Sequence, residues 1–112
     1  MSGIYKIENN LNGKIYIGQT QNVFKRRAEH FIALRRGRHP NQEMQRDWNL
    51  NNRGFRFDVV EYCALTQLNE REKYWIDQFN SMAPHGYNLD WVPYKRKKKT
   101  TGYKQKRYHK TR

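Results

Sequence analysis

The chain has 112 residues and a formal net charge of +13, which together allow one small basic domain with a modest hydrophobic core. No stretch approaches the ~20 consecutive apolar residues of a membrane span, and the chain does not open with a basic segment followed by an apolar core, so we expect neither membrane insertion nor secretion. Cys63 is the only cysteine, which excludes an intramolecular disulfide and a cysteine-based zinc finger and favours a reducing compartment.

Two short β-rich runs, residues 3–8 and 14–20, are separated by Asn and Gly and predict a β-hairpin. Each run contains a cluster of tyrosine and glycine: Gly3-Ile4-Tyr5 and Tyr16-Ile17-Gly18. If Asn12-Gly13 is a two-residue turn, Asn9 faces Tyr16, and Tyr5 lies on the same face as both. Two tyrosines side by side, next to glycines that admit a bulky partner, indicate a site, although packing alone would also produce them.

An amphipathic helix is predicted from its N-cap Asn22 to near Gly37. Its apolar residues recur at helical spacing along one side: Phe24, Ala28, Phe31 and Leu34. The other side carries Arg26 and His30, which are four residues apart and should therefore extend over one patch of surface. A basic helix face is usually only solvated, but the planar guanidinium can donate two hydrogen bonds to a phosphate.

Three further elements complete the predicted domain. A second helix follows Pro40 and ends at about Leu50, and residues 55–64 alternate as a third strand. A third helix, with Thr66 as its cap, runs to about Phe79. The predicted order is ββααβα, which is an α+β arrangement.

The third helix places a carboxylate inside its apolar stripe, which has the residues Leu68, Glu72, Trp75, Ile76 and Phe79. A buried lone carboxylate is costly, so Glu72 should pair with a base, bind a metal or stay neutral through a raised pKa. An ion pair with an arginine of the first helix and a functional carboxylate remain open alternatives.

The basic residues gather at the end of the chain. All ten acidic residues and 13 of the 23 Lys and Arg lie in residues 1–94. We therefore predict a domain over residues 1–92 and a flexible, nucleic-acid-binding tail over 93–112, which gains counterion-release free energy on a polyanion. Its candidate contacts are Lys95, Arg96, Lys97, Lys98, Lys99, Lys104, Lys106 and Arg107. A solubility tail and a localisation signal are the alternatives.

The chain resembles the GIY-YIG nucleases, and within them the catalytic domain of phage intron-encoded homing endonucleases. The resemblance extends over about residues 3–90 and rests on five elements in the family's order: the two tripeptides, Arg26 with His30, Glu72, and Gly86-Tyr87-Asn88. It implies a small three-stranded antiparallel sheet flanked by helices. It also implies hydrolysis of DNA phosphodiesters with one Mg²⁺ or Mn²⁺ per active site, in the cytoplasm of a bacterium or phage-infected cell.

The resemblance also assigns catalytic roles. Tyr16 is the expected general base or proton relay, with Tyr5 as its hydrogen-bonding partner. Because tyrosine ionises near pKa 10 in water, about three units above neutrality, this role needs a neighbouring cation or metal. Arg26 is expected to stabilise charge on the phosphoryl oxygens, and His30 to position the phosphate or assist proton transfer.

Three further site residues follow from the same resemblance. Glu72 is expected to bind the metal, because Mg²⁺ keeps several waters and needs few protein carboxylates. Asn88 corresponds to a late asparagine that supports the site. His39 resembles a histidine of the homing-enzyme branch, although the neighbouring Asn41 could be no more than a helix cap.

Other polar residues are candidates to line the DNA path: Lys14, Gln19, Arg27, Arg35, Arg36, Arg38 and Arg46. Homing enzymes usually continue into a linker and a separate DNA-recognition region, whereas this sequence ends in the basic tail. We therefore expect relaxed specificity, direction by a protein partner, or a fragment of a longer protein. The alternative function is a non-catalytic nucleic-acid-binding module.

Overall fold

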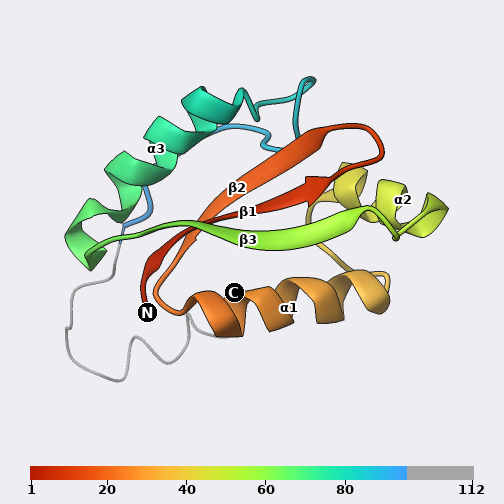
Figure 1. Ribbon diagram of the computed structural model, residues 1–112, viewed down its shortest axis with the longest axis horizontal. Helices are drawn as coiled ribbons and strands as arrows, with labels where there is room; N and C mark the ends of the chain where they lie inside the picture. The colour runs from red at the N-terminus through yellow and green to blue at the C-terminus, as the bar shows by residue number, and fades with distance from the viewer. Residues whose placement is uncertain (96–112) are drawn as a thin grey trace.

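The computed structural model describes residues 1–95 and contains the predicted elements in the predicted order (Figure 1). The strands are β1 (Gly3–Asn9), β2 (Lys14–Thr20) and β3 (Phe55–Tyr62). The helices are α1 (Val23–Arg35), α2 (Gln42–Leu50) and α3 (Leu68–Phe79), with a 3₁₀ turn, η1 (Leu65–Gln67), before α3. The strands form one antiparallel sheet in the order β2-β1-β3, so the predicted α+β fold is confirmed.

The hairpin register differs from the predicted one by two residues. Asn9 pairs with Lys14, and Tyr16 pairs with Ile7 rather than with Asn9. The turn is therefore longer than two residues: the backbone N–H groups of Asn12 and Gly13 both donate to Asn9 O, at 3.3 and 2.7 Å. Because side chains alternate with a period of two, an even shift in register keeps Tyr5 and Tyr16 on the same face.

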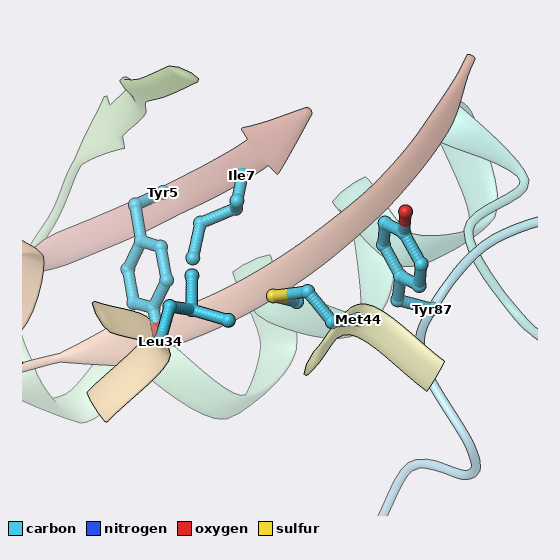
Figure 2. Packing of buried hydrophobic residues seen from close by; sticks show 5 residues of the cluster. All are labelled: Tyr5, Ile7, Leu34, Met44 and Tyr87. Atoms are coloured by element: carbon cyan, nitrogen blue, oxygen red, sulfur yellow. The ribbon is translucent and has the colours of Figure 1, made fainter. Parts of the chain in front are cut away.

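Each face of the sheet is covered by helices, with α1 on one side and α3 on the other (Figure 1). One hydrophobic cluster joins the sheet to α1 and α2 and has the buried members Tyr5, Ile7, Leu34, Met44 and Tyr87 (Figure 2). The other joins it to α3 and has the buried members Ile4, Ile17, Leu68 and Ile76. Alternate residues of β1 and β2 therefore face different helices.

Helix α1 begins as predicted, because Asn22 Oδ1 accepts a hydrogen bond from Lys25 N at 3.1 Å. The predicted apolar side is only partly right: Leu34 is buried, but Phe24 is 70% exposed. The helix buries Val23 and His30 together with Leu34 against the sheet. A polar histidine can replace an apolar residue there because both of its ring nitrogens have hydrogen-bond partners.

The caps of the other helices are mixed. Asn41 is the N-cap of α2, and its Oδ1 accepts from Met44 N at 3.0 Å. Thr66 is not the cap of α3, because η1 precedes the helix and Gln67 occupies the N-cap position. None of the helices in the described part of the chain is long and apolar enough to cross a membrane.

The outer edge of β2 is closed by two residues that follow α3. The backbone N–H of Tyr87 donates to Ile15 O at 2.9 Å, and the Asn88 side chain binds both backbone groups of Ile17. The Tyr87 hydroxyl donates to Asp47 of α2 at 2.7 Å. These contacts attach the segment after α3 to the strand that carries Tyr16.

Candidate active site

A cleft of about 440 Å³ lies beside β2, and it contains every residue to which the sequence assigned a catalytic role. Its lining includes Tyr5, Tyr16, Arg26, His30, His39, Glu72 and Asn88. The residues after Asn88, from Leu89 to Val92, complete the wall. The cleft therefore draws on both strands of the hairpin, on α1 and α3, and on two loops.

Tyr5 is held between its neighbours with little freedom. It is 2% exposed, and its ring stacks on Phe57 of β3 at a centroid distance of 4.9 Å and an interplanar angle of 16°. Across the hairpin it pairs with Gly18, where a Cβ atom would overlap the Tyr5 hydroxyl. The glycine of the second tripeptide thus makes room for the tyrosine of the first.

Behind Tyr5, two histidines form a buried hydrogen-bonded pair. The Tyr5 hydroxyl lies 2.7 Å from His30 Nε2, and His30 Nδ1 lies 2.7 Å from His39 Nε2. Burial, then His39 and Arg26, lowers the pKa of His30 to about 3, and burial lowers the pKa of His39. Neutral imidazoles are therefore the forms present near pH 7. Arg26 and His30 both line the cleft, but His30 is 8% exposed, so the two do not form the expected patch on the outer surface of α1.

Tyr16 lies on the edge strand β2, next to Tyr5 of the central strand β1, and their ring centroids are 6.3 Å apart. Burial is the largest cause that raises the pKa of Tyr16, and the negative charge of Glu72 raises it further. Arg26 and the hydrogen bond with Tyr5 oppose both effects. At neutral pH the hydroxyl of Tyr16 therefore keeps its proton, even with the Arg26 guanidinium in the same cleft.

Glu72 approaches from α3, which packs on the opposite face of the sheet from α1. Its Oε1 accepts a hydrogen bond from Gln19 Nε2 at 2.7 Å. Burial raises the pKa of Glu72, while Gln19 and then Trp91 lower it. Within residues 1–95 Glu72 forms no ion pair, which argues against the predicted alternative of a salt bridge with α1.

Arg26 is the cation of the cleft. Its Nε lies 3.5 Å from Glu29 Oε1, and 44% of its side chain is exposed, so the guanidinium can leave this weak contact. Its charge lowers the pKa of both Tyr5 and Tyr16, against the larger effect of burial. Arg26 therefore lies near both phenols while remaining open to an anion in the cleft.

Asn88 acts through the backbone of β2. Its Oδ1 accepts from Ile17 N at 2.9 Å and from Ser81 Oγ at 2.7 Å, and its Nδ2 donates to Ile17 O at 2.9 Å. These bonds hold the residue that follows Tyr16. In this geometry Asn88 contacts the backbone of the strand that carries Tyr16.

The donor set suits a hard divalent cation that needs few protein ligands. No group of three or more His, Cys, Asp or Glu side chains within residues 1–95 could enclose a metal ion. Two carboxylates line the cleft, Glu72 and the exposed Asp90, and Glu72 forms no ion pair among the described residues. Mg²⁺ is compatible with such a site because it keeps several waters and accepts substrate oxygens as further ligands.

Among the predicted DNA contacts within residues 1–95, Gln19 and Lys95 line a neighbouring cavity together with Tyr16, Arg26 and Glu72, and the others lie outside both cavities. Arg27, Arg35 and Arg36 are exposed on or beside α1. Lys14 forms an ion pair with Glu43, which competes with binding of a phosphate. Lys95 is the last described residue and is exposed, and the tail residues from Arg96 to Arg107 lie outside the described part of the chain.

Two amides near Glu72, those of Gln19 and Asn69, were not predicted as part of the site. Gln19, predicted only as part of a DNA path, donates to Glu72 and also to Asn69 Oδ1, at 2.8 Å. Asn69 in turn exchanges two hydrogen bonds with the backbone of Tyr94, each of 2.9 Å. One signal was available: Gln19 lies three residues after Tyr16 and so occupies the opposite face of β2, toward α3.

Several known proteins are similar to this chain in fold and in sequence. A family model described as the GIY-YIG catalytic domain matches residues 1–88. Intron-associated endonuclease 1 of Enterobacteria phage T4 is 37% identical over 90 residues, which are 79% of this chain and 36% of that protein. The chain therefore spans about a third of the length of this relative.

Two solved structures also match. The catalytic domain of the homing endonuclease I-TevI superposes with a TM-score of 0.72 and 35% identity, over 80% of this chain and 99% of that one. A mutant of the same catalytic domain gives a TM-score of 0.73 and 33% identity, over 84% and 98%. The chain belongs to the GIY-YIG family, and residues 1–88 are its GIY-YIG catalytic domain.

Proposed function

We propose that the protein is a metal-dependent DNA endonuclease that hydrolyses phosphodiester bonds. The observation that carries this proposal is the meeting of Tyr16, Arg26 and Glu72 in one cleft, although they come from a strand edge and from helices on opposite faces of the sheet. The endonuclease names of the T4 relative and of I-TevI support it.

Tyr16 is the proposed general base. In its phenolate form it accepts a proton from the attacking water, whose oxygen forms the new bond to phosphorus while the bond to the leaving sugar oxygen breaks. Arg26 donates hydrogen bonds to the phosphoryl oxygens as their negative charge increases. Glu72 holds the cation, and Gln19 keeps one carboxylate oxygen oriented.

When bound to Glu72, Mg²⁺ supplies positive charge that opposes the effect of the carboxylate on Tyr16 and stabilises the phosphate oxygens. The charge of Glu72 is the second cause of the raised pKa of Tyr16, after burial. The pKa of Tyr16 therefore depends on the charge at Glu72. A cation held by Glu72 would lower this pKa and so favour the phenolate form of Tyr16.

For the rest of the chain, we propose that residues 1–92 form the nuclease domain and that the basic segment 93–112 adds affinity for DNA. Ten of the 23 Lys and Arg lie within its last 18 residues, without an acidic residue among them. Such a segment contributes affinity that depends on salt but reads no base edges. Deletion of residues 96–112 should reduce the salt dependence of DNA binding and leave the residues of the cleft unchanged.

The test of the proposed activity is plasmid cleavage with and without Mg²⁺ or Mn²⁺, comparing the wild type with Glu72→Ala and Glu70→Ala. Glu70 is exposed on the same helix and serves as the matched control. We expect metal-dependent nicking or linearisation by the wild type and Glu70→Ala, and none by Glu72→Ala. DNA binding without product under every metal condition would instead favour the non-catalytic binding module.

A further inference from the structure

The buried hydrogen bonds behind Tyr16 form one continuous chain. Asn41 N donates to His39 Nδ1 at 3.0 Å, His39 Nε2 lies 2.7 Å from His30 Nδ1, and His30 Nε2 lies 2.7 Å from the Tyr5 hydroxyl. Both histidines are 8% exposed, and Tyr5 is 2% exposed. Water therefore has little access to the ring nitrogens and the hydroxyl that form these contacts.

We propose that the backbone N–H of Asn41 sets the direction of this chain, so that His39 and His30 are positioning residues that turn the Tyr5 hydroxyl hydrogen toward Tyr16. The catalytic consequence of this direction rests on the proposed role of Tyr16. The roles of donor and acceptor follow step by step from the one group that cannot change them.

The first group in the chain has a fixed role, because a backbone N–H can only donate. His39 Nδ1 must therefore be the acceptor, which leaves the single proton of a neutral ring on Nε2. His39 Nε2–H then donates to His30 Nδ1, and His30 in turn carries its proton on Nε2. His30 Nε2–H donates to the oxygen of Tyr5.

The opposite direction places two hydrogens in one short contact. If His39 carried its proton on Nδ1, that hydrogen would face the N–H of Asn41 across 3.0 Å. If His30 carried one on Nδ1, it would face the Nε2–H of His39 across 2.7 Å. A second proton on either ring creates the same conflict, in agreement with the lowered pKa of both histidines.

The last link gives Tyr5 a defined function. Because its oxygen accepts from His30, its own hydrogen is available to another acceptor, and Tyr16 is the neighbouring phenol. Burial is the largest cause that raises the pKa of both tyrosines, so both hydroxyls keep their hydrogens near pH 7.

This direction leaves the Tyr5 hydroxyl as a donor already in place for a phenolate at Tyr16. A phenolate at Tyr16 keeps the hydrogen bond from Tyr5, whereas a phenolate at Tyr5 would need the Tyr16 hydrogen to turn away from the cleft. The hydrogen of Tyr16 is thus left for the cleft that contains Glu72 and Arg26. The two histidines contribute without touching substrate or giving up a proton.

The test combines the histidine tautomers with a matched pair of variants of the full chain. Two-bond ¹H–¹⁵N spectra of the wild type near pH 7 should show His30 and His39 as neutral Nε2–H tautomers. The amide introduced by His39→Gln can meet His30 with either its oxygen or its nitrogen, whereas His39→Asn keeps an acceptor for Asn41 N–H but has no group that meets His30.

We expect His39→Gln to lose the preference of His30 for the Nε2–H tautomer, because the direction set by Asn41 N–H no longer reaches this ring. His39→Asn should lose the tautomer preference and about 10- to 100-fold in cleavage rate, as for other groups that fix a histidine tautomer. Tyr5→Phe should leave both tautomers intact but lose the rate, because only the last link is removed. Equal melting temperatures would establish that the variants are folded.

An Nδ1–H tautomer or an imidazolium at either histidine of the wild type would overturn the proposal. So would full activity of Tyr5→Phe in a cleaving enzyme. If the wild type shows both Nε2–H tautomers yet cleaves no DNA under any metal condition, the proposed nuclease function fails while the hydrogen-bond direction stands.

Discussion

The two sides of strand β2 are organised differently. On the side of α1, Tyr5, His30 and His39 are buried and joined by hydrogen bonds of 2.7 Å. On the side of α3, Glu72 is a carboxylate with a raised pKa, one hydrogen bond to Gln19 and no ion pair among the described residues. On the side of α1 the hydrogen-bonding groups have partners within the protein, whereas on the side of α3 the carboxylate of Glu72 can still bind a ligand.

The difference assigns separate tasks to the two sides. Fixed donors and acceptors in a dry interior determine where a proton lies, and they need no rearrangement during reaction. A partly desolvated carboxylate without a cationic partner favours the arrival of a cation. Tyr16 lies at the strand edge where the two sides meet, so substitutions on each side should produce distinct defects.

The largest effect is expected where the two sides meet. Tyr16→Phe keeps the ring and removes the hydroxyl, so the proposed base is lost while packing is preserved. We expect single-turnover cleavage to fall by about 10²- to 10⁴-fold, the usual contribution of a general base. The melting temperature and DNA affinity should change little. Cleavage at the wild-type rate would remove Tyr16 from the mechanism.

A second large effect is expected from Arg26→Ala, which removes the cation of the cleft. The cleavage rate should fall by about 10²- to 10³-fold, as for the loss of other groups that stabilise developing charge. Its exposed contact with Glu29 contributes only about 0–1 kcal/mol to stability, so urea denaturation should show a folded protein. Arg27→Ala is the matched control, because Arg27 is exposed and points elsewhere on α1. Unfolding of Arg26→Ala would instead indicate a structural role.

An intermediate effect is expected from Gln19→Leu, which acts only on the side of Glu72. Loss of a group that orients a metal ligand typically weakens metal affinity by about 10- to 100-fold, and Mn²⁺ titration followed by electron paramagnetic resonance would measure it. The hydrogen bond from Gln19 lowers the pKa of Glu72, against burial. Its removal should therefore raise this pKa and move the acidic limb of the pH–rate profile to higher pH.

The control for Gln19→Leu is Gln21→Leu, because Gln21 is exposed beyond the end of β2. Metal affinity and the pH profile should both remain unchanged in that variant. The His30 and His39 tautomers should stay as in the wild type in Gln19→Leu, since the two sides of β2 are separate. A change in either tautomer would show that the sides are coupled.

The smallest effect is expected at Phe24 on α1, which sequence periodicity wrongly placed on the buried face together with Leu34. Phe24→Ser should change the free energy of unfolding by no more than about 0.5 kcal/mol, because the Phe24 side chain is exposed. Leu34→Ala on the buried face should cost about 2–5 kcal/mol. Chemical denaturation measures the free energy of unfolding of both variants. A larger loss for Phe24→Ser than for Leu34→Ala would show that Phe24 is buried, as the sequence predicted.

Local signals account for what could be predicted of the fold. Asn22 and Asn41 cap α1 and α2 through bonds to residues three positions ahead, so these helix starts were visible in the sequence. Thr66 failed as a cap because η1 intervenes before α3. On α1, Leu34 is buried as predicted, but Phe24 is exposed and His30 is buried, because periodicity counts His30 as polar and does not detect the partners that allow its burial.

The sequence by itself determined the order of the elements and the shared face of Tyr5 and Tyr16, since strand alternation survives an even shift in register. It also marked Glu72 as a carboxylate that needs a reason to lie in an apolar stripe. Only the tertiary structure decided that Glu72 meets Tyr16 around the edge of β2 and that Gln19 binds it. It alone joined His30 to His39, because such contacts depend on how helices and loops far apart in the chain pack on one sheet.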